Sequence, residues 1–211
     1  MKTKLISGVL AMLILLSLSL VGCSNNGDEQ STPAKSSSNP TGTGNENSET
    51  ESPQSSGYTK EDLLAMPEAN ADDFSVKDVD GGVSITGVYS KNDVLIIPAQ
   101  INGKDVVAIG FQAFFGDKFK AVLLPDSIVA IGEKAFLGCE NLEVVYVKGN
   151  SLKKLDTSVF SMCGKLKYIE LPASVDEINP LGLASVTIIT PAGSYAETYA
   201  NQNEFEVKNS D

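Results

Sequence analysis

The sequence predicts a mainly β repeat solenoid that occupies the C-terminal part of a 211-residue chain. Three observations lead to this prediction. Apolar residues return with a period near 23, an alternating strand follows each return, and residues 24–57 contain too few apolar side chains to build a core. A repeat of this length cannot bury its apolar side alone, so neighbouring repeats must stack.

The composition excludes several classes of function. The chain has no His, its 16 basic residues are all Lys, and 27 Asp plus Glu give a net charge of −11. Without His there is no Ser-His-Asp or Cys-His catalysis and no His-ligated metal site. Without Arg, and with a negative net charge, the chain is poorly suited to phosphate backbones, so no nucleic-acid partner is expected.

Residues 1–22 have the features of an export signal. Lys2 and Lys4 precede an apolar run of about 17 residues, which is shorter than the roughly 20 that cross a bilayer. The run ends in Leu-Val-Gly-Cys, which resembles the lipobox of bacterial lipoproteins. That resemblance implies that Cys23 becomes a lipidated N-terminus and anchors the protein to a membrane. A transmembrane helix, or a secreted protein with an unmodified Cys23, is the alternative.

Residues 23–57 join this anchor to the rest of the chain. Residues 24–57 are dominated by Ser, Asn, Thr, Gly, Pro and Glu, and apart from proline their largest apolar residue is Ala34. Such a segment cannot bury a core, so the sequence predicts a disordered tether. A flexible coil of this length has a root-mean-square reach of roughly 30 Å.

Residues 58–93 are expected to form an N-terminal cap that begins with a helix. Thr59 and Asp62 have the spacing of a capping box, which predicts a short helix over residues 60–66. Pro67 prevents the helix from continuing far.

A β-hairpin is expected to complete this cap. Residues 74–79 and 83–89 alternate apolar with polar side chains on either side of Gly81, which supplies the positive φ of a tight turn. Asp78 and Asp80 have the spacing of the first two ligands of a calcium-binding loop. The ligands that would follow, including the bidentate Glu at the end of such a loop, are missing, so a hairpin turn is favoured.

Residues 94–190 carry the repeats. One apolar column is marked at spacings of 22, 24 and 23 by Ile109, Ile131, Leu155 and Ile178. Strands are predicted over residues 119–125, 142–148, 166–172 and 186–190. The sequence therefore predicts about four rungs of parallel strands.

The repeat resembles a known family. Its frame, Leu-x-x-Ile-x-Leu-Pro-x-Ser-Ile-x-x-Ile-Gly-x-x-Ala-Phe-x-x-Cys, is carried most fully by residues 125–139 and is similar to BspA-like leucine-rich repeat surface proteins. The resemblance implies a leucine-rich repeat solenoid, with residues 191–211 forming a C-terminal cap with a helix. It also suggests adhesion to host matrix proteins or to other bacteria. Asp117 departs from the pattern, because it stands where Cys139 and Cys163 stand.

Alternation along the strands separates core from surface. The inward residues are predicted to be Phe119, Val122, Leu124, Leu142, Val145, Val147, Leu166, Ile169 and Leu171, with Phe114, Phe136 and Phe160 stacked beside them. Cys139 and Cys163 share one column, about 4.8 Å apart. Buried free thiols are favoured there, although the spacing and export would permit a disulfide.

The outward side chains are unusually apolar for a surface in contact with water. They predict a contiguous exposed patch as the ligand-binding face, with Tyr146 and Tyr168 as anchors. The alternative is that β-propensity alone selected these residues. The predicted ligand-binding face consists of Ile96, Leu123, Val144, Tyr146, Tyr168, Glu170 and Ile188.

No enzyme activity, cofactor or metal is expected. Asp176 and Glu177 could form a glycosidase pair, but a solenoid surface lacks the cleft that such a pair needs. The leading hypothesis is an exported membrane lipoprotein on the cell surface that binds an extracellular protein or glycan. The alternative is an envelope-internal scaffold that partners a membrane or wall complex. The Ser-rich tether favours a single-membrane cell, whereas Ser24 after Cys23 favours an outer membrane.

Overall fold

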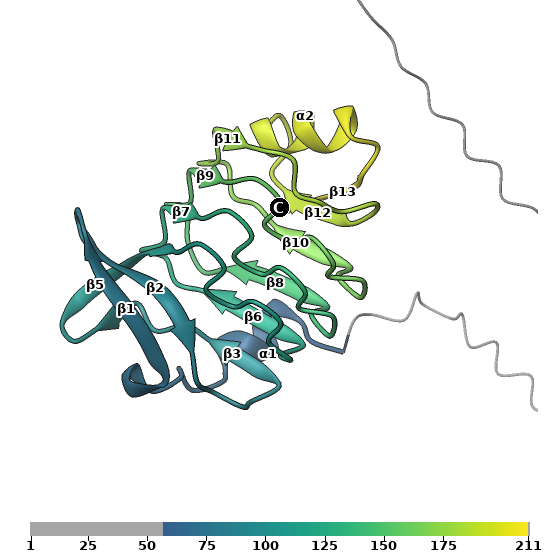
Figure 1. The fold of residues 1–211 in the computed structure, drawn as a ribbon. Helices are drawn as coiled ribbons and strands as arrows, with labels where there is room; N and C mark the ends of the chain where they lie inside the picture. Colours follow the sequence, from purple (N-terminus) through teal and green to yellow (C-terminus); the bar gives the residue numbers. More distant parts are fainter. Residues whose placement is uncertain (1–56, 211) are drawn as a thin grey trace, which may run out of the picture. The chain divides into compact units, whose positions relative to one another are not determined.

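Two β-sheets run side by side along a solenoid in the computed structural model, which describes residues 57–210 (Figure 1). Sheet A contains, in spatial order, β1 (Phe74–Val79), β2 (Gly82–Val88), β5 (Lys104–Ile109), β7 (Ala130–Ile131), β9 (Lys154–Leu155) and β11 (Glu177–Ile178), with β4 (Gln100–Ile101) paired to β5. Sheet B contains β3 (Val94–Ile96), β6 (Ala121–Leu124), β8 (Val144–Val147), β10 (Tyr168–Glu170), β12 (Thr187–Thr190) and β13 (Glu206–Asn209). The predicted mainly β repeat solenoid is confirmed.

The repeat period explains the parallel pairing of both sheets. Successive repeats present the same segment at the same place, so Ile109 lies beside Ile131, Ile131 beside Leu155, and Leu155 beside Ile178 in sheet A. All four side chains are buried. The column that was predicted from their spacing is therefore one wall of the core.

Sheet B has six strands, which is more than the four rungs predicted. The first additional strand is β3, which lies 27 residues before β6 because the β4–β5 excursion interrupts the period. The second is β13, which follows a helix and pairs parallel to β12. Its sequence, Glu-Val-Lys-Asn, has little of the apolar pattern by which strands are recognised.

The predicted core is confirmed. All the inward residues named from the sequence are buried. The ring centroids of Phe114 and Phe136 lie 5.1 Å apart, and those of Phe136 and Phe160 lie 5.3 Å apart. Cys139 and Cys163 are buried free thiols, as favoured. Each Sγ donates to a carbonyl of the preceding repeat, Cys139 to Phe114 and Cys163 to Phe136, both at 3.0 Å.

The N-terminal cap consists of the predicted helix and hairpin. The capping box of Thr59 and Asp62 is present, and it starts α1 (Lys60–Leu64), which ends two residues earlier than predicted. A 3-10 turn, η1 (Ala71–Asp73), leads into the antiparallel pair β1 and β2.

The C-terminal end of the core is covered by α2 (Tyr195–Gln202), which lies beside β11 and β12 in Figure 1. Ser194 caps this helix by accepting a hydrogen bond from the Glu197 backbone N–H at 3.0 Å. Ala196 and Ala200 are buried against the core.

No helix within residues 57–210 is both long and apolar enough to cross a bilayer. The predicted signal peptide, Cys23 and the tether up to residue 56 lie outside the described residues.

Candidate functional site

The outer face of sheet B, where the ligand-binding face was predicted, presents two columns of side chains. The first column contains Val94, Ala121, Val144, Tyr168, Thr187 and Glu206. The second contains Ile96, Leu123, Tyr146, Glu170, Ile189 and Lys208. Both columns turn from apolar to polar toward β13.

The apolar part of this face is covered by α1, so the predicted exposure is wrong for four residues. The exposed fractions of Ile96, Leu123, Val144 and Tyr146 are 3%, 0%, 0% and 8%. Leu63 of α1 is fully buried against them. Strand alternation gives the outward direction of a side chain, but it cannot reveal that another segment of the chain lies over it.

Polar contacts hold α1 and the segment after it in place. Lys60 Nζ lies 2.7 Å from Glu170 Oε1, and both side chains are largely buried. The Ala69 backbone N–H donates to the Ile96 carbonyl at 2.8 Å. A second ion pair, between Lys148 and Glu68, is 2.8 Å long.

Ile188 was predicted to point outward and instead points into the core. It lies beside Ile169 in the ladder and is fully buried, whereas Thr187 and Ile189 face outward. The reason is the sequence of β12, Thr-Ile-Ile-Thr, in which two adjacent isoleucines fit either register. The shortened final repeat removes the spacing that would have decided between them.

At the edge of α1, the face is partly open around Tyr168, which packs with Ile189 against the cluster that α1 covers. We define the C-terminal face as Tyr168, Thr187, Ile189 and Glu206. The first three are partly exposed, and Glu206 is exposed. Thr187 Oγ1 donates to Glu206 Oε2 at 2.9 Å. A cavity of about 450 Å³ borders this face, and Tyr168, Thr187 and Glu206 line it.

Glu170 belongs to the predicted site but is engaged within the protein. Its Oε1 accepts a hydrogen bond from Lys60, and its Oε2 accepts one from the Val147 backbone N–H at 3.2 Å. Both carboxylate oxygens therefore have donors, and Glu170 serves to fix α1 on the sheet.

Glu177, one of the two carboxylates considered for catalysis, does not have the electrostatics of a general acid. Hydrogen bonds from Lys154 and Asn179 hold the pKa of Glu177 below its usual range. A glycosidase acid needs a raised pKa instead. Residues 57–210 also contain no group of three or more His, Cys, Asp or Glu side chains placed to hold a metal ion.

The repeats themselves identify the family. Six copies of the BspA type leucine-rich repeat region match residues 96–192. Residues 96–192 belong to the BspA-type leucine-rich repeat family. No curated protein matches it.

Solved structures resemble this BspA-type chain over little more than half its length. A leucine-rich repeat protein of T. pallidum is 30% identical, with 57% of this chain and 71% of that chain covered and a TM-score of 0.44. One from Bacteroides capillosus is 28% identical, covers 55% and 94%, and has a TM-score of 0.48. A leucine-rich cell surface protein of Faecalibacterium prausnitzii is 17% identical, covers 59% and 45%, and has a TM-score of 0.43.

Sequence reasoning missed two features that lie at the edges of the BspA-type array. The first is Leu63, whose only signal is a Leu-Leu pair in a short capped helix before the repeats. The second is Ile189, which the ambiguous register of β12 concealed. Both lie where the repeat frame no longer dictates position.

Proposed function

We propose that this chain is an exported, lipid-anchored leucine-rich repeat protein that binds an extracellular protein or glycan and catalyses no reaction. The Leu-Val-Gly-Cys motif that ends at Cys23 and membership of the BspA-type family support this proposal. The observation that carries the binding function is the C-terminal face, where the partly exposed Tyr168 and Ile189 lie beside Thr187 and Glu206 on the sheet. Aromatic anchors amid polar groups are typical of recognition surfaces.

The size of this face sets the expected affinity. A standard interface buries roughly 800 Å² on each partner, and α1 leaves only the last rungs of sheet B open. Binding by one copy is therefore expected to be weak. Many copies anchored on one membrane would strengthen it by multivalency.

The anchoring can be tested by changing one residue. Cys23→Ala removes the thiol that would accept the lipid, so we expect the protein to move from the membrane fraction to the soluble fraction or the medium. Fractionation with immunodetection measures this shift, and Ser24→Ala is the matched control. A Cys23→Ala protein that stays in the membrane fraction would contradict the lipid anchor.

The binding face can be tested on intact cells that display the full chain. We expect such cells to adhere to at least one protein or glycan of an extracellular-matrix array, and Tyr168→Ala to lower that adhesion at least tenfold. Phe115→Ala, which changes an aromatic residue that is 62% exposed on a repeat loop, is the control and should keep adhesion. If the Tyr168→Ala cells adhere as well as wild type, the binding face lies elsewhere.

Accessibility distinguishes the surface protein from an internal scaffold. Antibodies against residues 57–210 should label intact cells if the domain faces outward. Cells that are labelled only after permeabilisation, and that do not adhere to the array, would instead indicate an envelope-internal scaffold.

A further inference from the structure

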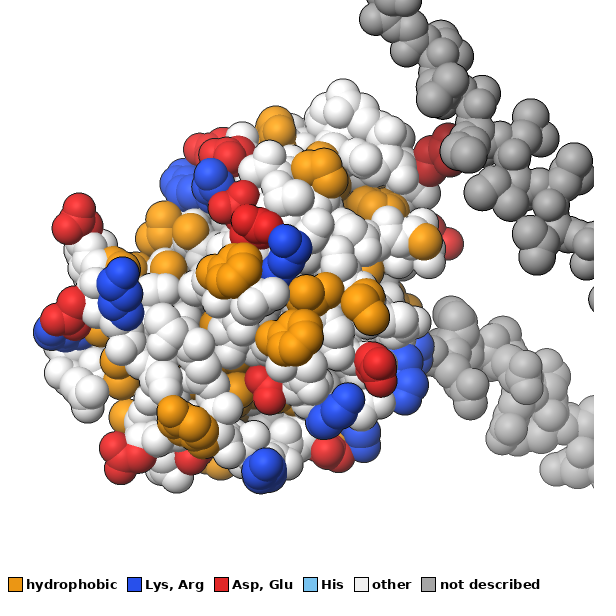
Figure 2. Space-filling model, in the orientation of Figure 1, with side chains coloured by type: hydrophobic (Ala, Val, Ile, Leu, Met, Phe, Trp, Pro, Cys, Tyr) orange, Lys and Arg blue, Asp and Glu red, His pale blue; other side chains and the backbone are white. Residues whose placement is uncertain are grey.

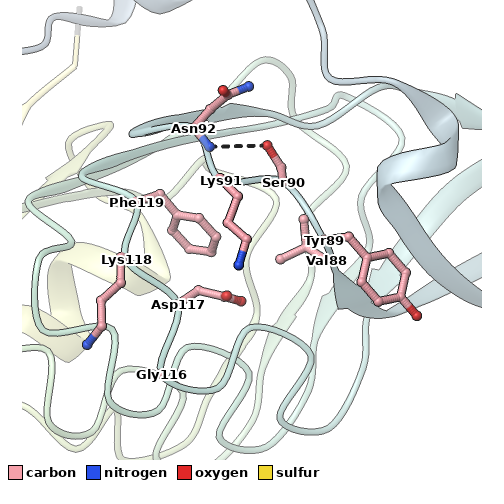
Figure 3. A pocket seen from close by; sticks show the side chains of 9 residues that line it. All are labelled: Val88, Tyr89, Ser90, Lys91, Asn92, Gly116, Asp117, Lys118 and Phe119. Atoms are coloured by element: carbon pink, nitrogen blue, oxygen red, sulfur yellow. Dashed lines mark hydrogen bonds between the residues drawn. The ribbon is translucent and has the colours of Figure 1, made fainter.

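A second polar pocket lies at the N-terminal end of the repeat stack, away from the C-terminal face (Figure 3). It has a volume of about 560 Å³, within the range of roughly 300–1,000 Å³ that is typical of small-molecule sites. One wall is the end of β2 with the loop that follows it, residues 88–92, and the other is the segment before β6, residues 116–119.

The pocket exists because the stack of repeat loops ends there. In later repeats the thiols of Cys139 and Cys163 donate to carbonyls of the repeat before them. Asp117 holds the same position, since its backbone N–H donates to Phe114 as the Cys139 N–H donates to Phe136. No earlier repeat of this kind precedes Asp117, so its carboxylate lies in the pocket instead.

Asp117 is half-buried and has no partner in the part of the chain that the structure describes. No hydrogen bond or ion pair reaches its carboxylate, and Lys91 likewise has none. Burial raises the pKa of Asp117, and Lys91 and Lys118 offset only part of that rise. In Figure 3, the Lys91 ammonium reaches over the pocket toward this carboxylate without a hydrogen bond between them. A half-buried carboxylate without a partner, beside an exposed lysine in the same cavity, is therefore a candidate binding site.

The lining indicates the chemistry of the ligand. Asp117 accepts hydrogen bonds and Lys91 donates them, while the Ser90 hydroxyl accepts from the Asn92 backbone N–H and keeps its own proton to donate. Lys118 also lines the pocket, but its ammonium lies 3.8 Å from Glu140 Oε2, so Asp117 and Lys91 are the charges that a ligand would meet. A simple anion would leave Asp117 unpaired, and an amine would leave Lys91 unpaired.

We propose that this pocket binds a saccharide that carries a carboxylate. Hydroxyl groups of the sugar donate to Asp117, the sugar carboxylate pairs with Lys91, and the partly exposed Val88 provides an apolar contact for its C–H face. Charge-assisted hydrogen bonds of this kind are stronger than neutral ones. The pocket shares no residue with the C-terminal face, so the proposal stands or falls independently of that surface.

The test is a titration of the purified full-length chain with glucuronate and, separately, with glucose. Saturation-transfer NMR measures the binding of each sugar. We expect glucuronate to bind at least tenfold more tightly than glucose. Lys91→Gln and Asp117→Asn should each weaken glucuronate binding at least tenfold. Lys77→Gln and Asp80→Asn make the same charge changes on the β1–β2 hairpin, outside the pocket, and should leave binding unchanged.

Three results would overturn the proposal: wild-type protein that does not bind glucuronate, equal binding of glucose and glucuronate, or full binding by either pocket variant. Thermal unfolding of each variant shows whether it is folded. A loss of binding in a variant with an intact unfolding transition therefore reports on the pocket itself.

Discussion

Asp117 illustrates how one position in a repeat takes on a different physical role at the end of an array. Cys139 and Cys163 are packed between repeats, and their thiols have acceptors. Asp117 has a repeat on one side only. A residue that would be excluded from the interior of the stack as a buried charge is tolerated at its open end.

The half-buried carboxylate of Asp117 should make the stability of the protein depend on pH. The pKa of Asp117 is raised in the folded state, so the folded chain binds more protons and its stability falls as pH rises through the titration of this carboxyl. Asp117→Asn removes the free-energy cost of keeping a charged carboxylate half-buried. We therefore expect this variant to have a higher melting temperature than wild type at about pH 7. At about pH 3, below the usual carboxyl range, the difference should vanish.

Calorimetry at the two pH values checks this expectation. The control is Asp80→Asn, on the hairpin turn, which should not reproduce the neutral-pH gain. An Asp117→Asn protein that melts at or below the wild-type temperature at neutral pH would show that the carboxylate is paired in solution.

At the scale of elements, the central feature is the short helix α1 on sheet B. A helix of five residues has no stability of its own in water, so packing must hold it. Leu63 supplies that packing, whereas its neighbour Leu64 is 52% exposed. The two leucines therefore provide a matched pair of substitutions.

We expect Leu63→Ala to lower the free energy of unfolding of α1 and its contacts by about 2–4 kcal/mol, the usual cost of truncating a buried leucine. Leu64→Ala should stay within about 0.5 kcal/mol of wild type. Hydrogen exchange of the amides of residues 60–65 measures the local effect, and denaturant unfolding measures the global one. Equal protection in the two variants would mean that Leu63 does not hold α1 on the sheet.

The elements also show what the sequence can predict. Strand alternation placed Val122, Val145 and Ile169 in the core because each strand repeats the same environment. The capping box of α1 was readable because it is a local signal. The position of α1 over sheet B could not be predicted from the sequence, because its packing over Tyr146 depends on contacts between residues far apart in sequence. The predicted exposure of the site residues was therefore wrong where α1, which is not part of a repeat, packs on the repeats.

At the scale of the whole molecule, both ends of the solenoid must be closed. Exposed ends of a repeat array are apolar, and atypical terminal segments protect them. Here α2 and β13 close the C-terminal end. Ala200 is fully buried there and Asn201, the next residue of the helix, is exposed.

We expect Ala200→Lys to lower the free energy of unfolding by about 3 kcal/mol or more, because it places a charge against the core. Asn201→Lys adds the same charge on the exposed side and should change stability by less than about 0.5 kcal/mol. Denaturant unfolding and light scattering compare the two variants. A stable, monomeric Ala200→Lys protein would show that α2 is dispensable for closing the array.

The position of α1 in the chain has a mechanical consequence. A pull applied through the residues before Gly57 reaches α1 before it reaches any strand of sheet B. The force would act on the Lys60–Glu170 pair and on Leu63 one after another, and sequential rupture needs less force than breaking all contacts at once. Tension along the chain would thus strip α1 first and bring Ile96, Leu123 and Tyr146 into contact with water, while the repeats beneath stayed folded.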